Sequence, residues 1–197
     1  MACRDGTAHG LRERGLSVLF DVAIIGLGPA GACLANLLGQ RGLSVVVLER
    51  EADIYPLPRA IHFDGEVMRI FQNAGLAAAL LPHVRASQGM QYINPQGQWL
   101  LERKPATTAG MHGWANNYLF HQPDVERILR NGLAAHPSVQ VRLQHEVIGV
   151  QPDPAGVDIH MTDLARDQPQ RLRAQWVLGC DGARSKVREH MATGFDD

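Results

Sequence analysis

The stretch Ser17-Val-Leu-Phe-Asp-Val-Ala-Ile-Ile-Gly-Leu-Gly-Pro-Ala-Gly31 decides the fold that the sequence predicts. Its first nine residues are rich in β-branched and aliphatic side chains, which is typical of a buried strand. Residues 29–40 carry apolar side chains at helical spacing, and Gly42 stands where the end of a helix is expected. Residues 43–48 have the pattern of a second buried strand. The sequence therefore predicts a β-α-β unit whose two strands are parallel neighbours.

Three glycines occupy the turn between the first strand and the helix, in the spacing Gly26-x-Gly28-x-x-Gly31. Gly26 permits a tight turn, Gly28 lets the backbone approach a pyrophosphate, and Gly31 lets the helix pack closely on the strand. The amides and the dipole at the start of the helix attract an anion. We therefore predict a dinucleotide site at this turn, with Pro29 and Ala30 among its contacts.

An acidic residue ends the second strand, as this kind of site requires. Glu49 lies 18 residues after Gly31 and is placed to accept hydrogen bonds from both hydroxyls of a ribose. Its charge argues against a 2′-phosphate in the same pocket, because two negative charges would face each other. The alternative, a chance glycine-rich turn beside a solvated glutamate, does not explain why strand, turn, helix and acid all agree.

The rest of the chain does not continue as further β-α-β units, as a plain NAD dehydrogenase would. In chain order we expect a loop at 51–62, a helix at 64–73, a short helix ending near 81, a hairpin at 90–101, a surface loop at 104–117 and a helix at 124–136. Strand-like segments follow at 139–143, 146–151, 157–162 and 172–178. A strand-end turn at residues 179–182 leads to a helix that Ser185 opens.

Four landmarks in this order resemble the class A flavoprotein monooxygenases, the single-component aromatic hydroxylases. The glycine turn with Glu49 resembles their ADP-binding fingerprint. Pro58-Arg59-Ala60 resembles the segment whose arginine lies near the flavin. Gln122-Pro-Asp-Val-Glu126 resembles the helix start whose glutamine touches the cofactor, and Asp181-Gly182, with Ser185 and Arg188, resembles the Asp-Gly motif shared between FAD and the reduced nicotinamide. Within the family, the likeness is to the 3-(3-hydroxyphenyl)propionate hydroxylase type.

The resemblance implies an α/β fold: a glutathione-reductase-like, FAD-binding Rossmann-type parallel sheet with a three-stranded β-meander as crossover. It implies FAD as cofactor and NADH or NADPH as reductant, with oxygen used to hydroxylate a small phenolic or aromatic substrate. No residue is predicted to act as a general base. The predicted cofactor contacts are Gly26, Gly28, Pro29, Ala30, Gly31, Glu49, Arg50, Arg59, Gln122, Val147, Asp181 and Gly182.

Three of these landmarks also have ordinary structural interpretations. Arg59 would otherwise serve as a solvated loop cation. Gln122 would serve as a helix cap beside Pro123. Asp181-Gly182 would serve as a plain turn at a strand end, with Ser185 as an N-cap.

Length and motif content divide the chain into a flexible leader at 1–16 and an FAD-binding domain at 17–197, with the start of a substrate region near 88–120. Hydroxylases of this family are much longer, and they carry a substrate sheet and a Gly-Asp motif after the Asp-Gly segment. We therefore expect a truncated, N-terminal portion, with doubtful activity on its own and exposed apolar surface that favours self-association into a homo-oligomer.

Composition excludes several other classes of protein. The net charge is -1 and the apolar fraction is 45%, so neither nucleic acid nor a membrane is an expected partner and a cytoplasmic location is the default. Three scattered cysteines and nine histidines without a close pair predict neither disulfides nor a metal site. The competing functions are a non-catalytic module that binds ADP, FAD or NAD, a degenerate remnant, and a flavin-dependent reductase or halogenase.

Overall fold

The computed structural model describes residues 19–104 and 109–191. The predicted leader at 1–16 lies outside these ranges, as do part of the predicted surface loop and the last six residues. No helix in the described part of the chain is long and apolar enough to cross a membrane.

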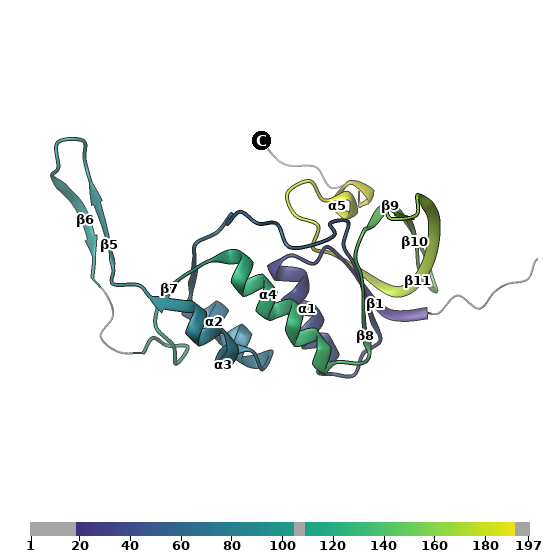
Figure 1. Cartoon of the computed structure of the whole chain (residues 1–197), viewed down its shortest axis with the longest axis horizontal. Helices are drawn as coiled ribbons and strands as arrows, with labels where there is room; N and C mark the ends of the chain where they lie inside the picture. The colour runs from purple at the N-terminus through teal and green to yellow at the C-terminus, as the bar shows by residue number, and fades with distance from the viewer. Residues whose placement is uncertain (1–18, 105–108, 192–197) are drawn as a thin grey trace, which may run out of the picture.

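A six-stranded sheet forms the body of the molecule (Figure 1), in the spatial order β8-β2-β1-β11-β10-β9. Its strands are β1 (Leu19–Ile25), β2 (Val45–Leu48), β8 (Val139–Arg142), β9 (His145–Asp153), β10 (Gly156–Asp163) and β11 (Gln168–Gly179). The first four in spatial order are parallel, and the predicted β-α-β pairing of β1 with β2 is confirmed. All four residues of β2 are buried, which explains its unbroken apolar sequence.

The strand β11 joins two parts of this sheet. Its first half pairs antiparallel with β10, from Asp163 opposite Gln168 to Val157 opposite Ala174. Its second half pairs parallel with β1, as far as Ile25 opposite Gly179. The predicted three-stranded meander is therefore present as β9-β10-β11, and its last strand returns the chain to the centre of the sheet.

Two long helices run side by side over one face of the sheet (Figure 1): α1 (Pro29–Gly39) and α4 (Gln122–Gly132). The Asn36 side chain of α1 donates to the Leu129 carbonyl oxygen of α4 at 2.8 Å. Where both helices end, a Cβ on Gly39 of α1 would lie 2.7 Å from the ring of His136, which follows α4 in the chain. The two helices are therefore parallel, with their N-termini at the same end.

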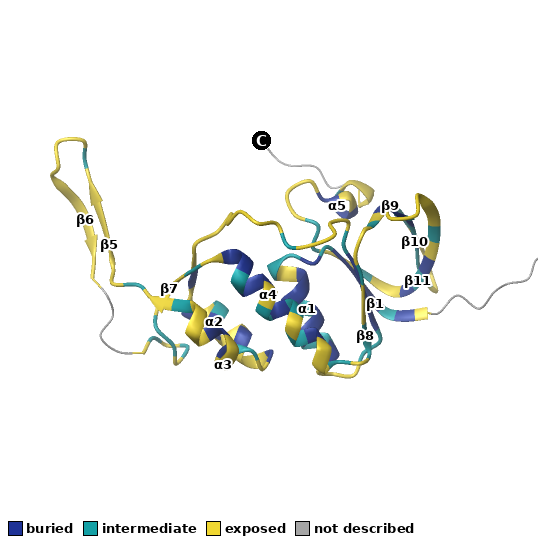
Figure 2. Cartoon of the chain, in the orientation of Figure 1, coloured by how far each residue is buried: buried dark blue, intermediate teal, exposed yellow. Residues whose placement is uncertain are grey.

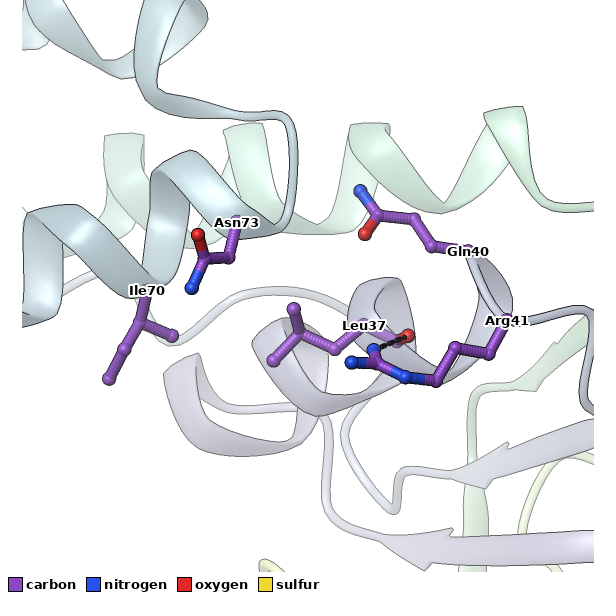
Figure 3. Close-up of a pocket in the computed structure, with 5 residues that line it drawn as sticks. All are labelled: Leu37, Gln40, Arg41, Ile70 and Asn73. Atoms are coloured by element: carbon purple, nitrogen blue, oxygen red, sulfur yellow. Dashed lines mark hydrogen bonds between the residues drawn. The ribbon is translucent and has the colours of Figure 1, made fainter.

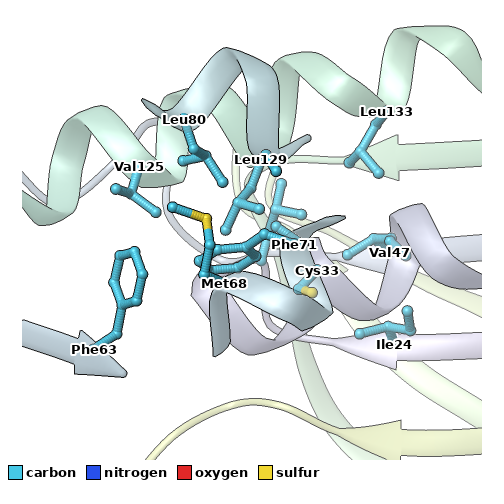
Figure 4. Close-up of a cluster of buried hydrophobic side chains, with 14 of the residues drawn as sticks. Ile24, Cys33, Val47, Phe63, Met68, Phe71, Leu80, Val125, Leu129 and Leu133 are labelled. Atoms are coloured by element: carbon cyan, nitrogen blue, oxygen red, sulfur yellow. The ribbon is translucent and has the colours of Figure 1, made fainter. Parts of the chain in front are cut away.

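The main apolar core lies between these helices, the sheet and the short helices that follow. Figure 4 shows Cys33 of α1, Leu129 of α4 and Val47 of β2 meeting the side chains of Met68 and Phe71. The short helices are α2 (Gly65–Asn73) and α3 (Ala77–Leu80), followed by the 3₁₀ turn η1 (Leu81–His83). The Asp64 carboxylate caps α2, accepting from the Val67 amide at 3.0 Å.

A second, three-stranded sheet corrects the prediction of loops around residues 62 and 117. It contains β3 (His62–Asp64), β7 (Asn117–Phe120) and β4 (Val84–Ala86), with β7 in the middle. Strands of three or four residues are too short to show a period of two. Their pairing joins residues that lie far apart in the chain, such as His62 with Leu119 and Val84 with Phe120.

The predicted hairpin at 90–101 is confirmed as β5 (Met90–Ile93) and β6 (Trp99–Arg103). It projects away from the rest of the chain (Figure 1), and every residue of both strands is exposed (Figure 2). The remaining elements begin or end within a few residues of their predicted limits. The α-helix predicted to start at residue 124 begins at Gln122 and ends at Gly132, and its last turn is the 3₁₀ segment η2 (Leu133–Ala135). Ser185 caps α5 (Lys186–His190), as predicted.

Candidate functional site: the carboxyl edge of the parallel strands

The glycine turn, Glu49 and the Asp181-Gly182 turn lie where three parallel strands end. The Gly26 amide donates to the Leu48 carbonyl oxygen of β2 at 2.8 Å, and the Cys180 amide after β11 donates to the Ile25 carbonyl oxygen at 2.7 Å. The strand β1 therefore lies between the ends of β2 and β11. The chain departs from β1 to one side at α1 and later returns on the other side as β11, which makes this edge a topological switch point.

The structure gives the three glycines of the turn different reasons to be glycine. Gly26 has φ +99°, and a Cβ there would lie 2.5 Å from the Cys180 carbonyl oxygen. A Cβ on Gly31 would lie 2.0 Å from the Gly26 carbonyl oxygen, so the start of α1 packs directly on the turn. A Cβ on Gly28 would meet no described atom within 4 Å. Gly28 is thus the position where the backbone faces open space.

The start of α1 has free capacity for an anion. Gly28 is the N-cap residue, and among the described residues no side chain caps the helix and its first turn contains no acid. Pro29 occupies the first turn, where its missing N–H costs nothing. The remaining first-turn amides and the positive end of the helix dipole therefore point at the space in front of Gly28.

Glu49 is held against the glycine turn. Its Oε2 accepts from the Leu27 amide at 2.7 Å, and its Oε1 accepts from the Glu51 amide at 2.9 Å. A carboxylate oxygen can accept more than one hydrogen bond, so both oxygens keep capacity for a ligand hydroxyl. The two backbone bonds fix the orientation of the acid beside the turn. The contact with Leu27 was not predicted from the sequence.

A second part of the candidate site joins the loop after β2 to the start of α4. The Gln122 Oε1 accepts from the amides of Arg59 at 2.8 Å and Ala60 at 2.7 Å. The Gln122 side chain therefore binds the loop and does not cap its own helix. The Arg59 guanidinium lies 5.2 Å from the centre of the Tyr55 ring, within the range of a cation–π contact.

The parallel packing of α1 and α4 places the two parts at the same end of the molecule. Asn36 of α1 contacts Leu129 of α4. Pro29 and Gln122 each lie seven residues before these two positions, so the first residues of the two helices lie at the same level. Both helix N-termini therefore open toward the carboxyl edge of the sheet.

Asp181 and Gly182 lie at the same edge, directly after β11. A Cβ on Gly26 would lie 3.0 Å from the Asp181 Cα, so the two turns touch. The Asp181 carboxylate accepts from the Ser185 hydroxyl and from the Lys186 amide, each at 2.6 Å, and so fixes the start of α5. Gly182 has φ +80° and is exposed, and a Cβ there would meet no described atom within 4 Å.

Arg50 and Val147 are placed differently from the others. The Arg50 guanidinium is exposed and pairs with the neighbouring Glu51 carboxylate at 3.1 Å. Val147 in β9 is buried, with 7% of its surface exposed, and its side chain belongs to the core beneath the meander. Any contact that Val147 makes with a ligand therefore involves its backbone.

Cys180 is a neighbour of the turn that the sequence did not indicate. A Cβ on Gly31 would lie 3.3 Å from its Cβ. Burial, with a smaller contribution from the Asp181 charge, raises the pKa of the Cys180 thiol. The thiol therefore stays protonated at neutral pH and packs as a small apolar group.

One pocket of about 500 Å³ lies elsewhere, between the C-terminal end of α1 and α2 (Figure 3). Its lining is Leu37, Gln40, Arg41, Ile70 and Asn73, and the Arg41 guanidinium turns back to the Leu37 carbonyl oxygen at 2.8 Å. This pocket is at the opposite end of α1 from the glycine turn, so it is not part of the candidate site.

Comparison with known proteins identifies the family to which the chain belongs. The chain belongs to the family described as FAD binding domain, whose model matches residues 20–196. The family resemblance predicted from the four landmarks is therefore confirmed.

Curated relatives of the chain are hydroxylases. The chain is 40% identical over 180 residues to a 3-(3-hydroxy-phenyl)propionate/3-hydroxycinnamic acid hydroxylase of Paraburkholderia xenovorans strain LB400, covering 91% of this chain and 28% of the relative. It is 39% identical over 178 residues to a probable NADH-specific resorcinol 4-hydroxylase of Rhodococcus jostii strain RHA1, covering 90% and 33%. The chain thus spans about a third of the length of these relatives.

Solved structures agree on the fold. The p-nitrophenol 4-monooxygenase of Pseudomonas putida DLL-E4 superimposes with a TM-score of 0.84 at 28% identity, over 92% of this chain and 45% of that one. A flavin-dependent monooxygenase in complex with FAD and substrate superimposes with a TM-score of 0.81 at 22% identity, over 91% of this chain and 33% of that one, and shows the same fold. The chain is therefore a mixed α/β domain with a largely parallel sheet.

Proposed function

We propose that this chain binds FAD in an extended form along the carboxyl edge of its sheet, as the cofactor domain of an aromatic hydroxylase. The ADP half lies on the glycine turn and Glu49, and the flavin half extends toward the Arg59 loop and the Asp181-Gly182 turn. The finer fold class that goes with this function is the glutathione-reductase-like one, and the proposed location is the cytoplasm.

The open space at Gly28 is the observation that carries this proposal. Gly28 has φ -70° and ψ -174°, a conformation that any residue adopts, and a Cβ there would meet no atom of the described residues within 4 Å. Folding alone therefore gives no reason for a glycine. A pyrophosphate that contacts the backbone at the start of α1 gives that reason.

Glu49 supports an adenosine ribose next to this pyrophosphate. Its two oxygens are held by the amides of Leu27 and Glu51, and each oxygen keeps acceptor capacity for a ribose hydroxyl. Replacing Glu49 with Gln would keep the shape but turn one acceptor into a donor. The ribose would then lose one charge-assisted hydrogen bond.

The flavin half distinguishes FAD from NAD or ADP in this proposal. When bound, FAD supplies the redox chemistry, and the residues of this chain supply placement. The backbone at Arg59 and Ala60, fixed by Gln122, forms one wall beside the flavin. The exposed amides of the Asp181-Gly182 turn form the other, because the Asp181 carboxylate is already engaged by α5.

The substrate and the reductant follow from the relatives. We propose a small phenolic substrate, because the curated relatives are named for hydroxyphenylpropionate and resorcinol, and NADH or NADPH as the reductant. The projecting, exposed hairpin β5-β6 is the proposed start of the substrate region near residues 88–120.

Binding and reduction of the flavin test this proposal in one sample. The chain is titrated with FAD while flavin fluorescence is followed, and NADH or NADPH is then added without oxygen. Saturable binding with bleaching of the flavin absorbance on reduction supports the cofactor domain of an oxidoreductase. Saturable ADP binding with no gain in affinity for FAD overturns it in favour of a non-catalytic dinucleotide-binding module.

A further inference from the structure

A buried carboxylate lies behind the contact between α4 and the Arg59 loop. Glu126 has 2% of its surface exposed and stands one turn after Gln122 on the same helix. Its Oε1 accepts from the Gln122 Nε2 at 2.7 Å, and its Oε2 lies 3.7 Å from the Arg130 guanidinium. Burying a charge is costly unless it has partners, so this placement needs a physical reason.

The chemistry of the Gln122 carboxamide supplies the reason. An amide group has nearly the same shape at its oxygen and nitrogen ends, and only its partners decide which way it points. The Glu126 Oε1 accepts a hydrogen bond from the Gln122 Nε2, so Glu126 holds the nitrogen end of the amide. The oxygen end must then face the loop. The reversed amide would set oxygen against carboxylate and NH₂ against two N–H donors.

The loop depends on this orientation. Every residue from Tyr55 to His62 is exposed, so apolar burial does not hold the segment in place. The backbone amides of Arg59 and Ala60 both donate hydrogen bonds to the same Gln122 oxygen, at 2.8 and 2.7 Å. A carboxamide that is free to reverse would release both amides together.

We infer that Glu126 is a positioning residue for the flavin side of the cofactor site: by fixing the Gln122 amide it holds the Arg59 loop in place, without touching the cofactor. The inference rests on the proposed function, because it takes the Arg59 loop as the wall beside the flavin. The glycine turn and Glu49 bind the ADP half through other contacts. Glu126 therefore sets the preference for FAD over ADP and leaves ADP binding itself unchanged.

The test compares the dissociation constants of FAD and ADP, measured by calorimetry, in three variants. Glu126→Met keeps the length and burial of the side chain and removes the acceptor. We expect the preference for FAD over ADP to fall by about tenfold, the effect of losing one or two hydrogen bonds, with ADP affinity within about twofold of wild type. Glu126→Met also leaves the nearly buried Arg130 guanidinium without this partner and is expected to lower stability, so the exchange variant described next carries the test if Glu126→Met does not fold.

An exchange of the two side chains tests orientation directly. In the double variant Gln122→Glu with Glu126→Gln, the new carboxylate accepts both loop amides, and the new amide donates to it and presents its oxygen to Arg130. We expect this exchange to restore most of the FAD preference. Asp163→Asn is the matched control, because Asp163 is a buried carboxylate in the meander, 1% exposed, and its loss is expected to leave the preference unchanged.

Hydrogen exchange on the cofactor-free protein gives a second readout that does not depend on binding. The amides of Arg59 and Ala60 are expected to lose protection in Glu126→Met and to regain it in the exchange variant. Wild-type preference and protection in Glu126→Met would overturn the positioning role while leaving the proposed function intact. A wild-type chain that binds FAD no more tightly than ADP would overturn the proposed function, and this inference with it.

Discussion

At the scale of single residues, the glycine turn separates positions that serve folding from one that serves a ligand. A Cβ on Gly26 or Gly31 would lie 2.5 or 2.0 Å from a backbone oxygen, whereas a Cβ on Gly28 would have no atom of the described chain within 4 Å. The same motif therefore contains glycines with two kinds of role. Substitutions at the positions of each kind are expected to have different consequences.

Gly31→Ala is expected to destabilise the fold by about 1 to 3 kcal/mol, because its methyl group would have to displace the backbone of the turn. Gly28→Ala is expected to change stability by less than about 1 kcal/mol, because its backbone already suits alanine while alanine is a poorer N-cap residue than glycine. Urea unfolding of the cofactor-free chain measures both. Equal losses in the two variants would contradict the division of roles.

Residue patterns predicted the spatial arrangement of one half of the candidate site and did not predict that of the other half. The glycines and Glu49 lie within one β-α-β unit, so their spacing along the chain determines how far apart they lie in the structure. The contact of Gln122 with the amides of Arg59 and Ala60 joins residues more than sixty positions apart, which no local pattern encodes. The spacing of Gln122 and Glu126 on a helix was the available signal for their pairing.

At the scale of elements, the β9-β10-β11 meander depends on a buried acid at one of its turns. Asp163 at the end of β10 accepts from the amides of Ala165 and Arg166 and from the Arg166 guanidinium, at 3.0, 3.2 and 2.7 Å. The hydrogen bond from the Arg166 side chain is the main reason that the pKa of Asp163 lies below its ordinary value. The ionised form of Asp163 therefore stabilises the turn.

This lowered pKa predicts how stability depends on pH. The contribution is fully present above the pKa of an unfolded aspartate, about 3.9, and is lost as the pH falls through the lower folded value. Between about pH 5 and pH 3, the melting temperature of wild type is expected to fall more steeply than that of Asp163→Asn. Thermal unfolding of both proteins across this pH range tests the prediction. Melting temperatures that fall equally with pH in the two proteins would contradict it.

The length of an element and the sequence distance to its pairing partner decide whether it could be predicted from the sequence. The strand β2 is short but wholly buried, and its run of apolar residues next to the glycine turn made it predictable. The strands β3, β4 and β7 have three or four residues each and form only because β7 pairs with both of the others. Long-range pairing of this kind overrides local sequence preference.

At the scale of the whole molecule, the hairpin β5-β6 is the part that the fold leaves without support. Trp99, Leu100 and Leu101 are 63%, 67% and 59% exposed, and the hairpin forms a sheet of its own (Figure 2). A two-stranded hairpin is marginally stable alone, and its edges offer unpaired backbone groups to another chain. This surface is therefore where contact with further polypeptide is expected.

We expect the chain to self-associate as its concentration rises, and Trp99→Thr combined with Leu101→Thr to reduce that association. Threonine retains the preference for a strand while removing most of the apolar surface. Sedimentation velocity over a range of concentrations measures the effect. Met111→Thr is the control, because Met111 is 93% exposed but lies outside the hairpin. Equal association of both variants with wild type would contradict a role for the hairpin.

The most direct test of the central claim is retention of flavin by wild type, Gly28→Val and Gly149→Val after incubation with FAD and removal of free cofactor. Gly149 lies on β9, and among the described residues a Cβ there would come within 4 Å of the His190 ring alone, at 3.6 Å. We expect the visible flavin absorbance to remain with wild type and Gly149→Val and to be lost from a folded Gly28→Val. Flavin retained equally by a folded Gly28→Val would contradict a cofactor site at the glycine turn.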